Sequence, residues 1–546
     1  MRDAGQRFSN PMVALLAATA VLVAATIACQ KTAPPAARES AAEKAPEAGR
    51  ERDRFKVELA EKAAFPLEKH LESKDIASGA VAFPQLFEAG DKLFHTPYNG
   101  LDGVGMQKTV AGAAIPRFSV GPIAGSPVPV GVQACGSCHA IPFGAGAGLA
   151  HTRVFFDVDQ NGVPPFNARA TTSLFGNGVV QRVAEEMTEK LFAARDAAAN
   201  EAKAKPGTPV RGALLVNGVD FGAVTATADA GGNVKFDVSE VRGVSPDLVI
   251  RPFGWKGSIT TVRNFAVAAA SFGMGMQAEE FVWRLPPTVG ADPDADGVSR
   301  ELSVGDITAI TIYNAAQEAP TELARVAALG VVPAPDAAGQ GMIDRGRTLF
   351  GQVGCATCHV PEIRLADTVF EEPTKRGAGQ YVDAFLAGKD PDYDTNRPVR
   401  FDLLKDSQEP RIEAHPEGGA VVRLYGDLKR HDMGRRLADP AAGGVLTVSL
   451  APLQFEGKPA MVPASEYLTP ELWGVGNTGP WMHDDRAGTL AEAITLHGED
   501  SPPAPGQPGR SEAQEARDAY VKLSPDDQRA LVAFLKSLVN FSREED

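Results

Sequence analysis

Apolar residues recur with the spacing of a helix face in several stretches of the chain. Near the C-terminus, Ser524 and Pro525 are suited to be the N-cap and the first residue of a helix. The apolar stripe that follows comprises Leu531, Phe534, Leu535, Leu538 and Val539. Another helix is predicted to begin at Thr489–Glu492, which has the T-x-x-E pattern of a capping box. One face of that helix carries Leu490, Ile494 and His497.

The patterns predict a chain that is mainly α, with one β insertion. Val183–Asn200 is helix-like, whereas Val210–Val238 alternates between apolar and polar residues and is interrupted by glycine turns, as strands are. We therefore expect a small β insertion at about residues 205–245. Val331–Gly341 is rich in Pro, Ala and Gly and is predicted to be a linker. It separates an N-terminal domain, residues 55–330, from a C-terminal domain, residues 342–546.

The N-terminal segment predicts export from the cytoplasm. Two arginines precede the apolar run Met12–Ile27, whose length suits a signal peptide, and we assign residues 1–29 to it. The run ends in Thr-Ile-Ala-Cys29, which is similar to a bacterial lipoprotein cleavage box with Thr in place of the usual Leu. We expect a periplasmic protein that a lipid on Cys29 anchors to the membrane. Ordinary signal cleavage nearby, with Cys29 discarded, is the alternative.

The segment that follows, residues 30–54, is rich in Ala, Pro, Glu and Arg and has no apolar periodicity. We expect it to form a disordered tether.

Composition and charge narrow the classes of protein. The chain has 546 residues, of which 44% are hydrophobic and 23% are charged, as in soluble globular proteins. This balance excludes a multi-span membrane protein, a fibrous rod and a chain that is disordered throughout. The formal net charge of −15 disfavours nucleic acid as a partner. Five cysteines are too few for a disulfide scaffold of this size.

Four of the cysteines form two C-x-x-C-H motifs, Cys135–His139 and Cys355–His359. This spacing is the attachment signature of a c-type haem. Cys135 and Cys138 would bind one porphyrin and Cys355 and Cys358 a second, with His139 and His359 as ligands of the two irons. A zinc site or a redox disulfide is also compatible with paired cysteines. Neither of them requires a histidine directly after each pair.

A local repeat precedes the two motifs. Gly90–Phe94 and Gly346–Phe350 share the pattern G-x-x-L-F, with which small cytochrome c domains commonly begin. In the second unit a short gap separates this pattern from the motif, whereas in the first unit the gap, His95–Ala134, is long and rich in Gly and Pro. We therefore expect two cytochrome c-like haem domains, of which the first is elaborated. The last helix is expected to pack across the second G-x-x-L-F helix.

Five further side chains are candidates for the opposite faces of the haems. His497 is the candidate iron ligand of the second haem, and the alternative is a core histidine bonded to a carbonyl. His151 is the candidate for the first haem, and a surface position or a propionate contact competes with that role. His431 and His483 are candidates for propionate contact or proton delivery, and Met433 is a candidate soft ligand.

An acidic loop is similar to the opening of an EF-hand. Carboxylates stand at its first, third and fifth positions, which are Asp292, Asp294 and Asp296. The twelfth position is Ser303 instead of the bidentate Glu, although Glu301 is close by. Asp157–Gly162 is a weaker copy of the pattern. For each loop, a calcium site and a plain acidic turn are the two interpretations considered.

With these motifs, the chain resembles the bacterial di-haem cytochrome c peroxidase superfamily, and within it a branch of di-haem oxidoreductases also described as thiol oxidoreductases. Besides the two C-x-x-C-H motifs, the matching segments are FGWKG (253–257), DPDADGV (292–298), DLKRHDMG (427–434) and the segment 472–498. The resemblance extends from about Gly90 to Gly498.

The resemblance implies that the two haems have different roles. The C-terminal haem would collect electrons from a small donor protein, a cytochrome c or a cupredoxin. The N-terminal haem would bind and cleave hydrogen peroxide or another oxidant. The helix after the H-D-x-R-x-x-T-L segment would supply the distal ligand of the C-terminal haem, which is His497 here. In the peroxidases that ligand is often Met, and His generally lowers the potential.

The expected function is electron transfer from the His359 haem to the His139 haem, coupled to reduction of peroxide. Trp255 is a candidate for the path between them, and a role in the core is its alternative. The sequence assigns no catalytic acid or base. An electron carrier without a substrate, and a di-haem oxidase of an organic or protein substrate, are the other functions considered.

Overall fold

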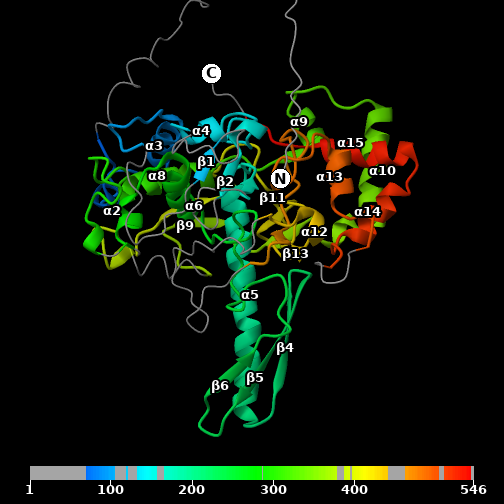
Figure 1. Cartoon of the computed structure of the whole chain (residues 1–546), viewed down its shortest axis with the longest axis horizontal. Coiled ribbons are helices and arrows are strands. Elements are labelled where there is room, and N and C mark those ends of the chain that lie inside the picture. The colour runs from blue at the N-terminus through cyan, green and yellow to red at the C-terminus, as the bar shows by residue number, and fades with distance from the viewer. Residues whose placement is uncertain are drawn as a thin grey trace, which may run out of the picture. The chain divides into compact units, whose positions relative to one another are not determined.

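The computed structural model describes residues 69–104, 118–120, 132–156, 165–285, 287–377, 386–393, 396–440, 462–502 and 509–542 (Figure 1). All of them belong to one compact unit, Glu58–Asp546. The predicted signal peptide with Cys29, the tether and the weaker acidic loop Asp157–Gly162 lie outside the described residues.

The region around the first C-x-x-C-H motif, called the first region below, has a pair of crossed helices at its centre. Helix α3 (Phe83–His95) packs against α8 (Val304–Ala315), and the two meet at Gly90. A Cβ atom at Gly90 would lie 2.1 Å from the carbonyl oxygen of Ala309, so only glycine permits this approach. The one-turn helix α4 (Cys135–Cys138) follows α3 and contacts it.

A second pair of crossed helices repeats this arrangement. Helix α10 (Ala337–Gln352) packs against α15 (Pro525–Lys536), as the sequence predicts for the last helix. A Cβ atom at Gly346 would lie 2.0 Å from the carbonyl oxygen of Ala530. Ser524 caps α15 by accepting a hydrogen bond from the Asp527 amide. The G-x-x-L-F glycine is therefore the contact point of both pairs.

A long helix and a small sheet occupy the region of the predicted β insertion. Helix α5 (Asn177–Ala204) is longer than the predicted helix at both ends. Figure 1 shows the sheet of β4 (Val210–Val216), β5 (Val219–Ala228) and β6 (Val234–Asp237) beside the C-terminal part of α5. The order β4-β5-β6 is antiparallel throughout, and the tight turn between β4 and β5 uses Asn217 and Gly218 at positive φ.

The remaining elements are short and connect these parts. The helices are α2 (Ser73–Ala77), η1 (Ala150–Thr152), α6 (Val262–Ala269), η2 (Ala270–Met274), α7 (Glu279–Val282), η3 (Pro287–Val289), α9 (Leu323–Ala328), η4 (Cys355–Thr357), α12 (Gly434–Leu437), α13 (Leu490–Leu496) and α14 (Gln514–Val521). The strands are β1 (Phe118–Val120), β2 (Val154–Phe156), β3 (Asn167–Arg169), β7 (Thr321–Glu322), β8 (Ile363–Leu365), β9 (Val369–Glu372), β10 (Val399–Asp402), β11 (Glu413–Ala414), β12 (Ala420–Val422), β13 (Arg430–Asp432), β14 (Glu466–Leu468) and β15 (Leu538–Val539).

The fold class is mixed: in the described residues helix exceeds strand, and all strand pairs belong to small antiparallel sheets. Two boundaries differ from the predictions. The predicted linker Val331–Gly341 ends early, because Asp336 caps α10 through the Gly339 amide and residues 337–341 are helical. Leu538 and Val539 belong to β15, which pairs with β7, and not to the last helix.

The main hydrophobic core lies around α5, α6 and α8, and a second core lies around α10 and α15. No helix among the described residues combines the length and the apolar character needed to cross a membrane.

Candidate functional site

Both C-x-x-C-H motifs form the same local structure. The first begins with α4 and the second with η4, and in each a helical turn brings the histidine amide back to the first cysteine. The His139 amide donates to the Cys135 carbonyl at 3.2 Å, and the His359 amide donates to the Cys355 carbonyl at 3.0 Å. This turn places both cysteines and the histidine of each motif on one short segment.

The motif histidines are partly buried and neutral. Burial lowers the pKa of both His139 and His359 to about 4. Nδ1 of His139 lies 3.0 Å from the Thr172 carbonyl oxygen, and Nδ1 of His359 lies 3.1 Å from that of Tyr425. A carbonyl only accepts, so Nδ1 carries the proton and Nε2 keeps its lone pair. Each imidazole is therefore held in the state that ligates a metal.

The four motif cysteines form no disulfide, and three of them, Cys135, Cys138 and Cys355, have little tendency to ionise. Burial raises the pKa of Cys135 to about 12, and those of Cys138 and Cys355 to about 11. A reactive dithiol or a zinc site needs thiolates, whose formation an electropositive setting favours. The apolar setting instead suits a neutral sulfur species, such as the thioether of an attached haem.

A cavity of about 630 Å³ opens beside the second motif, within the range of about 300–1,000 Å³ that is typical of cofactor sites. Its lining is mostly apolar and aromatic and includes Cys355, Cys358, His359, Trp255, Trp473, Trp481 and His497. The segment Ala170–Ser173 also lines the cavity. That segment contains Thr172, whose carbonyl holds His139. The cavity thus extends from the second motif to the residues that position the first.

His497 lines this cavity together with His359. Helix α13 begins where the sequence predicts, because Thr489 accepts a hydrogen bond from the Glu492 amide. His497 caps the end of α13, and its Nδ1 donates to the Ala493 carbonyl at 2.8 Å. Burial lowers the pKa of His497, so this ring too is neutral with Nε2 unprotonated. The ring centres of His359 and His497 are 6.4 Å apart.

These residues fit a haem held by two imidazoles. An imidazole nitrogen bonds a first-row metal at about 2 Å, so two axial imidazoles on one metal have ring centres roughly 6 Å apart. The separation of His359 and His497 matches that requirement, and both rings line the cavity beside Cys355 and Cys358. The carbonyl contact of His497 is made through Nδ1 and leaves Nε2 for a metal.

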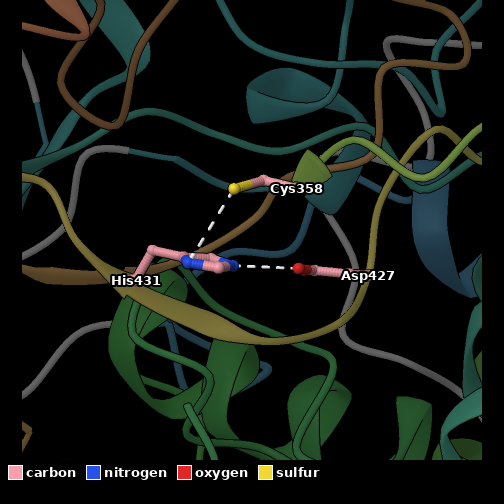
Figure 2. Close-up of side chains that lie close together, drawn as sticks. All are labelled: Cys358, Asp427 and His431. Atoms are coloured by element: carbon pink, nitrogen blue, oxygen red, sulfur yellow. Dashed lines mark hydrogen bonds and ion pairs between the residues drawn. The ribbon is translucent and has the colours of Figure 1, made fainter. Parts of the chain in front are cut away.

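His431 on β13 lies between Cys358 and Asp427 (Figure 2). The three side chains are close enough together to hold a metal ion. However, Nδ1 lies 2.6 Å from Glu512 and Nε2 lies 2.9 Å from Asp427, so both nitrogens donate to carboxylates. Burial opposes the charged ring, but the hydrogen bonds with Asp427, Cys358 and Glu512 raise the pKa of His431 to about 11. His431 is therefore a fixed cation in an ion-pair network.

The other candidate side chains surround the cavity. His483 stacks on Tyr467 at 4.3 Å between ring centres, and burial lowers its pKa to about 3. Trp255 donates from Nε1 to the Ala170 carbonyl at 2.8 Å and lies 6.4 Å from His483, ring to ring. Met433 is part of the cavity lining.

The side chain of His151 lies outside the described part of the chain, although its backbone belongs to η1. In the acidic loop, the carboxylates of Asp292, Asp294 and Asp296 approach within 4.8 Å of one another.

Sequence reasoning missed a buried polar cluster beside the cavity. Arg169 binds Asp439 with two hydrogen bonds of 2.7 Å each, and Tyr467 donates to the same carboxylate at 2.8 Å. Lys256 lies 3.1 Å from Asp439 and over the ring of Tyr467. Of the segments singled out from the sequence, FGWKG (253–257) contributes to this cluster, through Lys256. The contacts join residues far apart in the sequence, so no local pattern reveals them.

No protein-family model matches the chain. No curated protein matches it. Among solved structures, the chain has a distant similarity to one described as a MauG-like protein associated with microbial copper homeostasis. That similarity has 16% sequence identity and a TM-score of 0.26, and it covers 52% of this chain and 68% of the other. A similarity this weak defines neither the family nor the function of the chain.

Proposed function

We propose that the chain is an exported di-haem c-type cytochrome that transfers electrons between two covalent haems and reduces peroxide at the first. The observation that carries the proposal is the pair of partly buried, neutral imidazoles of His359 and His497, whose ring centres lie 6.4 Å apart in a cavity beside Cys355 and Cys358. When bound, the haems would supply one-electron transfer and the reduction of peroxide.

The chain's own residues would hold each group in a different way. At the second site, His359 and His497 would both bind the haem iron, which suits electron transfer without a substrate. At the first site, His139 would be the proximal ligand, and Cys135 and Cys138 the points of attachment. Phe94 packs 6.0 Å from His139, ring to ring, and Phe350 packs 6.5 Å from His359. These matching phenylalanines would orient the two proximal imidazoles.

The segment Ala170–Thr172 supports electron transfer between the two sites. Its Thr172 carbonyl holds His139, and its Ala170 carbonyl accepts the Trp255 indole at 2.8 Å. Trp255 and the neighbouring His483 line the cavity that contains His359. A short chain of bonds and hydrogen bonds therefore runs from the first proximal histidine to the wall of the second site. Trp255 is the side chain proposed to shorten the electron path.

The proposal includes a small donor protein that delivers electrons to the second site. It also includes export to the periplasm, with a lipid on Cys29 as the membrane anchor. The two-imidazole arrangement at the second site equally serves an electron carrier without a substrate, which is the second candidate function. Oxidation of an organic or protein substrate at the first site is the remaining alternative.

The test begins with the full chain purified from a periplasm that attaches haem. We expect two haems per chain that stay bound in acidified acetone, and a reduced second site that does not bind carbon monoxide. His497→Ala should open that site to carbon monoxide. His415→Ala, outside the cavity, is the control and should change nothing. A colourless chain, or unchanged carbon monoxide binding in His497→Ala, would contradict the proposal.

Enzyme and carrier are then separated by mixing the fully reduced protein with hydrogen peroxide. A peroxidase is reoxidised rapidly with consumption of peroxide and consumes it repeatedly when an electron donor is supplied. A carrier is not.

A further inference from the structure

The acidic loop between α7 and α8 brings four carboxylates together. The carboxylate oxygens of Asp292, Asp294 and Asp296 lie within 4.8 Å of one another. The fourth carboxylate, Glu301, lies beside them, because Gln277 donates hydrogen bonds to both Asp294 and Glu301. One oxygen of each is fixed by a donor: Gly297 N to Asp292, Gln277 Nε2 to Asp294, Val298 N to Asp296 and Gln277 N to Glu301. The loop and Gln277 therefore orient all four groups.

The second oxygen of each carboxylate is buried and has no hydrogen-bond partner among the described residues. Asp294 is 0% exposed, Glu301 is 2% exposed and Gln277 is 1% exposed. Gln277 adds a fifth buried oxygen without a partner, its Oε1. Buried polar atoms in folded proteins are almost always paired, and a buried carboxylate without a partner is costly. Five such oxygens in one place therefore indicate a missing ligand.

No cation of the described chain neutralises this group. Arg300, the neighbour of Glu301, donates instead to Glu279 at 2.8 Å and to Glu72 at 2.6 Å. Without a bound cation, the negative charges of these closely spaced carboxylates repel one another.

We propose that Asp292, Asp294, Asp296 and Glu301 bind one calcium ion, with the amide oxygen of Gln277 as a further ligand. Hard divalent cations prefer oxygen ligands, and calcium accepts six to eight of them in flexible geometry. Magnesium requires a near-octahedral set at shorter distances and gives up its waters reluctantly. A crowded set of carboxylates on an irregular loop therefore favours calcium.

The site would connect the loop to the first helix pair. The side chain of Glu301 packs against Gly103, where a Cβ atom would lie 2.3 Å from its Cγ. Ser303, which occupies the twelfth position of the EF-hand pattern, caps α8 and is not a ligand. A calcium ion here would hold the loop just before α8, the helix that crosses α3. Its expected role is to stabilise the first region.

The test uses the full chain as purified, before and after treatment with a calcium chelator. We expect the isolated protein to contain calcium. After chelation, the protein should bind one calcium ion per chain at this site, as measured by calorimetry. At calcium a hundredfold above Kd, the melting temperature should rise by about 3 °C or more. Magnesium at the same concentration should raise it less.

The variants Glu301→Gln and Asp294→Asn, which keep the side-chain shapes, should each weaken calcium binding roughly tenfold or more. Asp229→Asn is the matched control. Asp229 is exposed in a turn, and its oxygens accept hydrogen bonds from Gly231 and Asn233, so calcium binding should not change.

Two results would overturn the proposal. One is an unchanged melting temperature of the wild-type chain with calcium and with chelator. The other is a wild-type calcium affinity in both variants, because the ion would then bind elsewhere. If the variants do not fold, the calcium content and chelator response of the wild-type chain decide the question.

Discussion

The two C-x-x-C-H regions share one helix crossing and differ in what surrounds it. In the first, Gly90 of α3 meets Ala309, and Phe94 packs on Tyr313, four residues later in α8. In the second, Gly346 of α10 meets Ala530, and Phe350 packs on Phe534, four residues later in α15. The crossing is therefore repeated residue by residue, although the segments between its helices are unrelated.

The partner helices differ in their burial. Every residue of α8 is buried, because α3, α5 and α6 pack around it. In α15 only Ala530, Leu531, Phe534 and Leu535 are buried, and the remaining positions face outward or are partly covered. The same crossing therefore accompanies both motifs, whereas the surroundings of the two crossings differ. The first is embedded in the main core, and the second carries the open cavity.

The largest expected effect comes from breaking the buried cluster between the regions. Asp439 joins Arg169, which follows the first motif, to Lys256 and to Tyr467. Asp439→Ala would remove the carboxylate that neutralises two buried cations, Arg169 and Lys256, and we expect a loss of about 3–5 kcal/mol in the free energy of unfolding. Denaturant melts measure it.

Glu240→Ala removes an exposed ion pair with Arg211 and is the control, with an unchanged midpoint expected. An equal midpoint for Asp439→Ala and the wild type would show that the cluster does not hold the two regions together.

The next effect tests the crossing itself. Gly90→Ala places a methyl group against the Ala309 carbonyl inside a fully buried helix pair, and we expect a loss of about 2–3 kcal/mol. Gly346→Ala makes the same clash in the second pair, but α15 is buried on one side only and can shift outward. Its expected loss is smaller, about 1–2 kcal/mol. Thermal or denaturant unfolding of both variants gives the comparison.

Gly351→Ala is the matched control for the crossing. Gly351 lies in the last turn of α10, and nothing lies within 4 Å of a Cβ atom there. Alanine at this position should stabilise the helix by about 0.5–1 kcal/mol. Equal losses at Gly90 and Gly346 would show that the burial of the partner helix does not determine the cost.

The sequence predicts those features of the fold that depend on residues close together in the chain. The caps at Thr489 and Ser524 were predicted from sequence, because a side-chain cap depends on residues within one helical turn. The role of α8 was missed. It is buried on all sides, so it has no amphipathic stripe to show which face meets α3. The spacing of Ala309 and Tyr313, the same as that of Ala530 and Phe534, was its only signal.

Contacts between residues far apart in the sequence leave no local pattern from which they could be predicted. Arg169 and Asp439 are 270 residues apart, and nothing beside either residue indicates the other. His497 was predicted from its helix face, but its position opposite His359 depends on how α13 packs near α15. The last helix was predicted too long because Leu538 and Val539 continue its apolar pattern. Their pairing with Thr321 and Glu322 in β7, a tertiary contact, ends the helix instead.

The smallest expected effect is a pH dependence of the first region alone. His70 contacts Asp306, the residue that forms a capping box with Ser303 at the start of α8, with 2.6 Å between Nδ1 and Oδ2. At the start of α15, the corresponding Asp527 is paired with Arg345, which stays charged at all relevant pH values. The hydrogen bond to Asp306 raises the pKa of His70 above its ordinary value of 6.5, although burial opposes it.

A group with a raised pKa contributes its full stability below the unfolded value, and this contribution disappears as pH rises through the folded value. The stability difference between wild type and His70→Gln should therefore be about 1 kcal/mol near pH 5.5 and should decrease towards pH 9. Amide hydrogen exchange locates the effect: protection in α8 should follow this trend with pH after correction for the intrinsic exchange rate, whereas protection in α15 should not. A pH dependence that is the same in both helices, or that persists in His70→Gln, would assign it to another group.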